Sequence, residues 1–175
     1  MPFLHHIIFE HAITRGEKIA LEKGDEKISY ASLAELIQRF PSILQRIGNS
    51  EGSRIAVFSG KSIETVIALL GTMYAGRCVV PINPVLKTLQ LLHILQDCEA
   101  EVLIIDSARY TRLRDDVGAI TSLKSIIILD SGPDSLPAKS DKQSLYSWQA
   151  LLNTTQHLSE YNEPSDDQSL ACLIY

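Results

Sequence analysis

The chain has 175 residues, of which 45% are hydrophobic and 21% are charged, a balance typical of one globular domain or part of a larger one. The net charge is −5 and the basic residues form no stripe, which argues against a nucleic-acid-binding protein. Arg, Lys or Gly interrupts each apolar run before it reaches membrane-spanning length, so we expect no membrane span.

The first 29 residues predict a small helical and hairpin unit. An apolar stripe at helical spacing predicts a short amphipathic helix over residues 4–14, ended by Gly16. Two short strands follow at 18–22 and 26–29, and the turn residues Lys23-Gly24-Asp25 between them predict a β-hairpin. We assign no chemistry to this unit.

A second helix is predicted over residues 29–47. Ser29 fits its N-cap, because a serine hydroxyl can accept a hydrogen bond from a free amide in the first turn. Pro41 lies inside the apolar pattern and removes a helical hydrogen bond. We therefore expect the helix to kink, or to split at Phe40.

Strands and helices alternate from residue 54 onward. The strands are expected at 54–58, 78–80, 102–105 and 125–129, with helices over 62–75, 88–98 and 107–120. Such alternation predicts an α/β fold with a parallel sheet flanked by helices on both faces. The nearly continuous apolar strands agree with burial on both sides.

The composition changes at Asp130. Residues 130–168 are rich in Ser, Asp, Gly and Pro and predict a loop-rich connecting segment, with one short helix over 145–152 anchored by Trp148. Residues 169–175 are apolar again.

Gly60-Lys61-Ser62 invites interpretation as a nucleotide phosphate loop, but the spacing is wrong. The motif G-x-x-x-x-G-K-[ST] requires an earlier glycine five positions before Gly60, where this chain has Ile55 within a predicted strand. We interpret Ser62 as the N-cap of the following helix, with Glu64 favourably placed against its dipole.

Arginines are densest at positions 109, 112 and 114, and Asp115 and Asp116 offset them. We interpret Arg109, Arg112 and Arg114 as a solvated helix face and not as a phosphate site.

The histidines near the N-terminus, His5, His6 and His11, have no acidic or cysteine partner at a ligand spacing, so we predict no metal site there.

The three cysteines are far apart, and none forms a C-x-x-C pair. They are Cys78, Cys98 and Cys172. Their apolar or helical surroundings favour reduced thiols, as in a reducing compartment. The first residues of the chain also lack the basic flank and the cleavage site of a secretory signal. We therefore expect a cytoplasmic protein.

Five segments together resemble acyl-adenylate-forming enzymes, that is, acyl-CoA synthetases, peptide-synthetase adenylation domains and beetle luciferases. Residues 75–84 resemble A-G-x-x-x-x-P-(I/L)-(N/D)-P, residues 28–33 resemble T-Y-x-E-L, and residues 52–57 resemble G-D-R-V-A-V. Residues 88–105 resemble the helix and strand that come next, and residues 166–175 resemble P-x-D-x-A-x-I-x-Y. The chain departs from the family pattern at Ser32, Pro41 and the run Thr88-Leu89-Gln90-Leu91, which replaces T-P-E-E.

This resemblance implies that residues 1–175 form a single incomplete domain, the N-terminal portion of an AMP-binding domain. The intact relative would use ATP, Mg²⁺ and CoA: it would activate a carboxylic acid as an acyl-adenylate and transfer the acyl group to CoA or a carrier protein. Lys87, Gln90 and His93 favour the acyl-CoA ligase branch, although His93 is also an ordinary solvated helix residue.

In the family, a T-S-G-[ST]-T-G-x-P-K-G loop that cradles the ATP phosphates follows the last of these segments. We therefore assign no catalytic, cofactor-binding or metal-binding residue to this chain, and we expect it to be inactive alone in pyrophosphate exchange.

Two alternatives stay open. The chain could be a non-catalytic interaction module that completes a split enzyme, by binding a second chain or itself through an uncovered apolar face. It could also be an unrelated doubly wound nucleotide-binding domain, which would need a glycine-rich first β–α turn. The turn at residues 58–62 offers only Gly60.

Overall fold

The computed structural model describes residues 3–138, 142–155, 161 and 170–175. Its strands are β1 Ile19–Lys23, β2 Glu26–Ser29, β3 Arg54–Phe58, β4 Cys78–Pro81, β5 Val102–Ile105, β6 Ser125–Ile128 and β7 Ser144–Ser147. Its helices are α1 His6–Arg15, α2 Tyr30–Gln38, α3 Phe40–Arg46, α4 Ile63–Tyr74, α5 Thr88–Asp97, α6 Ser107–Val117, the 3₁₀ turn η1 Pro133–Ser135 and α7 Trp148–Thr154. None of the described helices is long and apolar enough to cross a membrane.

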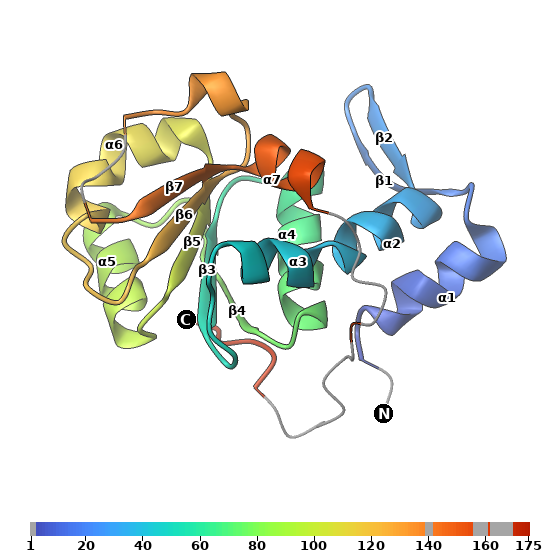
Figure 1. Cartoon of the computed structure of the whole chain (residues 1–175), viewed down its shortest axis with the longest axis horizontal. Coiled ribbons are helices and arrows are strands. Elements are labelled where there is room, and N and C mark those ends of the chain that lie inside the picture. Colours follow the sequence, from blue (N-terminus) through green and yellow to red (C-terminus); the bar gives the residue numbers. More distant parts are fainter. Residues whose placement is uncertain (1–2, 139–141, 156–160, 162–169) are drawn as a thin grey trace.

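The centre of the molecule is a five-stranded sheet in the order β4-β3-β5-β6-β7 (Figure 1). Every neighbouring pair is parallel, which confirms the predicted α/β fold. β3 and β5 have the predicted bounds, and β6 ends one residue earlier than expected. All five strands therefore present their carboxyl ends at one edge of the sheet.

Successive strand residues face two separate cores, so helices cover both faces of the sheet. In β3, Ile55 and Val57 belong to the core that contains α2, α3, α4 and α7. Ala56 and Phe58 belong to the core that contains α5 and α6. Figure 1 shows the two groups of helices on opposite sides of the strands. Burial on both faces explains why these strands have no polar alternation.

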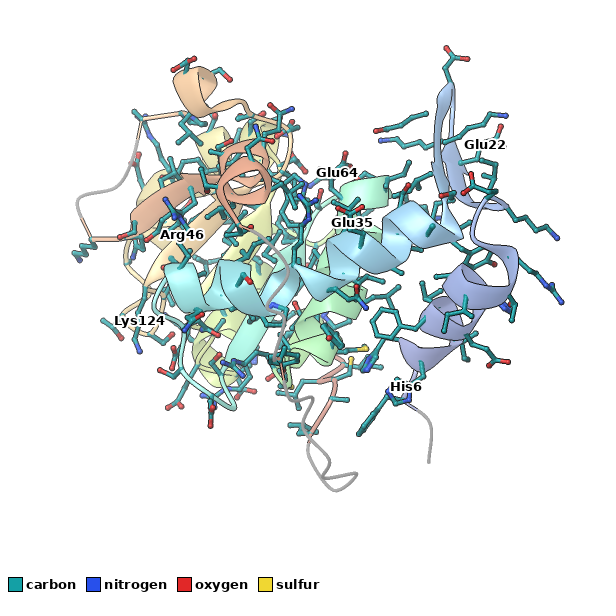
Figure 2. The ribbon with its side chains drawn as sticks, turned by 45° about the vertical axis from the view of Figure 1, so that its right-hand side comes forward. His6, Glu22, Glu35, Arg46, Glu64 and Lys124 are labelled. Atoms are coloured by element: carbon teal, nitrogen blue, oxygen red, sulfur yellow. The ribbon has the colours of Figure 1, made fainter. Side chains whose placement is uncertain are left out.

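The N-terminal unit lies to one side of the sheet. The antiparallel pair β1–β2 forms the predicted hairpin, with Gly24 at φ +61° in its turn. Figure 2 shows Glu22 on this hairpin, well away from Arg46 and Lys124 on the body that carries the sheet. α1 packs against α2, and the hairpin strands contact α2 and α4.

The predicted helix over residues 29–47 is split as expected. α2 ends at Gln38, and α3 begins at Phe40 with Pro41 in its first turn, where no amide donor is needed. Ser29 caps α2 by accepting a hydrogen bond from the Ser32 amide at 3.2 Å. The prediction of an N-cap at Ser29 is therefore confirmed.

One expected helix was wrong at its start. The helix was predicted over 145–152, but Leu145 and Tyr146 lie in β7, which pairs with β6. Ser147 ends the strand and caps α7, accepting from the Ala150 amide at 3.2 Å. A short helical pattern is a weak preference, and tertiary contacts can override it. Here the backbone groups at the edge of β6 form parallel hydrogen bonds with β7. Residues 156–160 and 162–169 of the predicted connecting segment lie outside the described residues.

Residues 170–175 lie beside β4 on its outer side. The Val79 amide donates to the Ala171 carbonyl at 3.0 Å, and the Leu173 amide donates to the Val79 carbonyl at 2.9 Å. The bridge between Val79 and Cys172 is parallel, so this segment runs in the same direction as the sheet strands. Its carboxyl end therefore points toward the edge where β3, β4 and β5 also end.

Candidate functional site

A pocket of about 420 Å³ lies between the N-terminal halves of α5 and α6, above the end of β3. Phe58, the last residue of β3, contributes to its apolar lining together with Leu91 and Leu113. Its polar lining includes three cations: Lys87, Arg109 and Arg112. We call this feature the cationic pocket.

The Arg109 side chain of this pocket is held by two contacts. Its guanidinium carbon lies 5.7 Å from the centroid of the Phe58 ring, which is cation–π geometry. Its Nη1 also donates to Oδ2 of Asp106, one turn earlier in the chain. The side chain is 28% exposed, so it is only partly screened by water.

Asp106 follows β5 directly and caps α6. Its Oδ1 accepts a hydrogen bond from the Arg109 amide at 3.0 Å, and the Ser59 hydroxyl donates to Oδ2 at 3.4 Å. A second carboxylate, Asp130, follows β6 and accepts from the Ser107 amide at 2.7 Å. Polar residues after β3, β5 and β6 therefore meet at the carboxyl edge, and they fix the start of α6.

Lys87 and Arg112 complete the cationic pocket from its exposed side. Lys87 is the N-cap residue of α5, and its amide donates to the Gln90 side chain at 3.0 Å. Arg112 lies one turn after Arg109 on α6, and its Nε donates to the Ala108 carbonyl at 3.1 Å. The N-termini of both helices lie beside the pocket, which adds to its positive potential.

The arginine group was expected to lie together on a solvated helix face. Arg114 does so, 3.5 Å from Asp115 with 44% of its side chain exposed. Arg112 is also exposed on α6, and together with the half-buried Arg109 it lines the cationic pocket. The missed signal was position: Arg109 is three residues after Asp106, which ends a buried strand of a parallel sheet.

The other residues weighed in the sequence lie elsewhere. Ser62 caps α4 by accepting from the Thr65 amide at 3.0 Å, so its N-cap prediction is confirmed. His11 stacks edge-on against Tyr30 at 5.0 Å, and His93 is exposed on α5. No group of three or more His, Cys, Asp or Glu side chains in the described part of the chain could hold a metal ion.

All three cysteines are free thiols. Cys78 and Cys98 are buried, and Cys172 is partly exposed. Burial raises the pKa of each thiol above its ordinary value, so the reactive thiolate is disfavoured. These residues therefore behave as small apolar side chains and not as nucleophiles.

The cationic pocket can bind a ligand that combines negative charge with a flat or apolar part. Guanidinium and ammonium groups supply charge-assisted donors for phosphate or carboxylate oxygens. The apolar lining supplies contact area that an inorganic anion would not use. The charged and apolar groups of the lining are therefore suited to holding such a ligand.

The profile of one family, described as AMP-binding enzyme, matches residues 8–175. The chain belongs to this family. AMP-binding relatives include syringomycin synthase SyrB1 of Pseudomonas syringae pv. syringae, which is 30% identical over 79% of this chain and 22% of its own length. A long-chain-fatty-acid–CoA ligase of Salmonella typhimurium is 31% identical over 75% of this chain and 24% of its own length.

Solved AMP-binding structures share the fold. The anthranilate CoA ligase AuaEII, solved in complex with anthranoyl-AMP, superposes with a TM-score of 0.80 and 21% identity over 95% of this chain and 30% of that one. The chain thus spans about a quarter of the length of the two curated relatives and 30% of the solved one. The resemblance to acyl-adenylate-forming enzymes is therefore confirmed, and the fold is that of their N-terminal subdomain.

Proposed function

We propose that this chain is the N-terminal part of an ATP-dependent, AMP-forming ligase, which activates a carboxylic acid as an acyl-adenylate and transfers it to CoA. AMP-binding membership over residues 8–175 supports the activation step. The intact enzyme would use ATP and Mg²⁺. The described residues contain no set of metal ligands, so we assign no residue to the metal.

Residues 170–175 support a role for the carboxyl edge in nucleotide binding. They run parallel to β4 and are therefore directed toward the edge of the sheet that carries Ser59 and Asp106. In the family that this chain resembles, the phosphate-binding loop follows the strand at this point. In the proposed enzyme, that loop would begin beside the carboxyl edge, and this chain would supply the scaffold below it.

The cationic pocket is the observation that carries the choice of acceptor. The two relatives differ here, since one is named a synthase of syringomycin and the other a CoA ligase. CoA carries a phosphorylated adenosine, whereas a carrier protein presents phosphopantetheine without that nucleotide. Lys87, Arg109 and Arg112 beside the Phe58 ring match a phosphorylated, partly flat ligand. We therefore propose free CoA as the acceptor.

Calorimetric titration of the chain with CoA tests this proposal, with pantetheine as the matched ligand that lacks the nucleotide. We expect CoA to bind and pantetheine to give no measurable heat. Arg112→Gln should weaken CoA binding by up to about fivefold, because an exposed ion pair is worth at most about 1 kcal/mol. Equal binding of CoA and pantetheine, or no CoA binding, would contradict the proposed acceptor.

One observation favours the alternative of a split enzyme completed by a second chain. Along residues 170–175, Leu170 is 58% exposed and Ile174 is 82% exposed, at the outer side of the sheet. An apolar strand edge of this kind can pair with another polypeptide. The other alternative, an unrelated doubly wound domain, gains no support from the family match.

We also propose that the protein works in the cytoplasm. The three free thiols, two of them buried, support a reducing compartment.

A further inference from the structure

Arg109 is held on several sides within the cationic pocket. Its guanidinium lies over the Phe58 ring, with 5.7 Å between the guanidinium carbon and the ring centroid. Asp106 accepts from Nη1 of that guanidinium through Oδ2, and from the Arg109 amide through Oδ1 at 3.0 Å. Only 14% of the Asp106 side chain is exposed, and the Ser59 hydroxyl donates to it at 3.4 Å.

We propose that Asp106 is a positioning residue, which holds the Arg109 guanidinium ready for the phosphates of the ligand in this pocket. The inference rests on the proposed function, which assigns the pocket to CoA. A guanidinium has five N–H donors in one plane. Asp106 and the Phe58 ring use one donor and one face, so further donors of Arg109 are left for a ligand.

Two opposing effects of Asp106 can be separated. Its contacts restrict Arg109 before the ligand arrives, and restricting one such side chain on binding is worth about a two- to tenfold factor in affinity. Its negative charge also lowers the positive potential of the pocket, which disfavours an anion. The positioning role requires the first effect to exceed the second.

Asp106→Asn distinguishes these effects in the intact chain, because asparagine is as good an N-cap as aspartate. Asp115→Asn is the matched control: it removes the same charge from the same helix, at a side chain that is 94% exposed and lies beside Arg114. With CoA as the titrant, we expect Asp106→Asn to weaken binding two- to tenfold. Asp115→Asn should leave binding unchanged or make it slightly tighter.

A double-mutant cycle then tests whether Asp106 acts through Arg109. In an Arg109→Gln background, adding Asp106→Asn should cause no further loss of CoA affinity. If Asp106→Asn does not fold, as judged by its thermal unfolding, Asp106→Ser takes its place, since serine is an equally good N-cap.

The outcomes separate the two levels of inference. Absence of CoA binding by the unmodified chain would overturn the proposed acceptor and the positioning role with it. CoA binding by the unmodified chain, with Asp106→Asn equal to Asp115→Asn or binding more tightly, would overturn the positioning role alone. The same holds if Asp106→Asn weakens binding equally with and without Arg109.

Discussion

The two faces of the sheet are built alike but end differently at the carboxyl edge. Beside α4, the face ends at the hairpin in a groove of about 180 Å³, whose charged lining mixes Glu22 with Lys23 and Lys61. Beside α5 and α6, the face opens into the larger cationic pocket, whose charged lining is all positive. Alternate residues of the same strands face the two cores, so both faces are built on one set of strands.

The difference comes from the residues that follow each strand. After β5 and β6, Asp106 and Asp130 fix the start of α6, so that Arg109 and Arg112 face the space beside α5. At the start of α4, Ser62 caps the helix and Lys61 is exposed next to the hairpin. The α5–α6 face therefore ends in a pocket lined by cations, and the α4 face does not.

The largest expected effect tests whether both faces are packed cores. Ile104 and Leu103 are adjacent in β5, fully buried, and face opposite sides of the sheet. Ile104→Ala and Leu103→Ala should each lower the free energy of unfolding by about 2–5 kcal/mol. Urea denaturation measures both. A Leu103→Ala cost below about 1 kcal/mol would show that the α5–α6 face is loosely packed.

A smaller effect sharpens the description of the α4 face. Gly71 lies against Phe40, and a Cβ added there would be 2.3 Å from a ring carbon. Gly71→Ala should therefore destabilise the fold by about 1–3 kcal/mol through overpacking. Gly60→Ala is the control, because the nearest atom to its added Cβ is Arg109 Nη1 at 4.0 Å. If the two variants unfold at the same urea concentration, α3 does not pack on α4 as described.

The smallest effect concerns the contact between residues 170–175 and the α5 face. The Tyr175 hydroxyl donates to Asp97 at 2.5 Å, and this hydrogen bond raises the pKa of Tyr175 to about 12. Because the folded pKa is raised above the ordinary value of 10, this contact stabilises the fold fully below pH 10 and is lost as pH rises through about 12. Ultraviolet titration should show a late-titrating tyrosine that Asp97→Asn moves toward 10. Identical titrations of the two proteins would rule out the contact.

Much of the sheet could be predicted because its strands are locally unambiguous. β3 and β5 are short, continuous apolar runs bounded by polar residues, and burial on both faces requires that pattern. The helix split at Pro41 and the caps at Ser29 and Ser62 depend on neighbours within four residues, so they were also predictable. β7 could not be predicted in this way, because its residues pair with β6 residues that lie 19 positions earlier in the chain.

The sequence by itself determined the alternation of elements, the family and the separation of the two cores, since these follow from local periodicity and from motifs within single segments. Only the tertiary structure decided that Lys87, Arg109 and Arg112 share one pocket with Phe58. Phe58 ends β3, Lys87 is the N-cap of α5, and both arginines lie in α6. The order of the strands in the sheet decides which of these distant residues meet at one edge, and local sequence does not give that order. Charge density along the chain indicated a solvated helix face, whereas in the structure Arg109 and Arg112 of α6 line a pocket together with Lys87, the N-cap residue of α5.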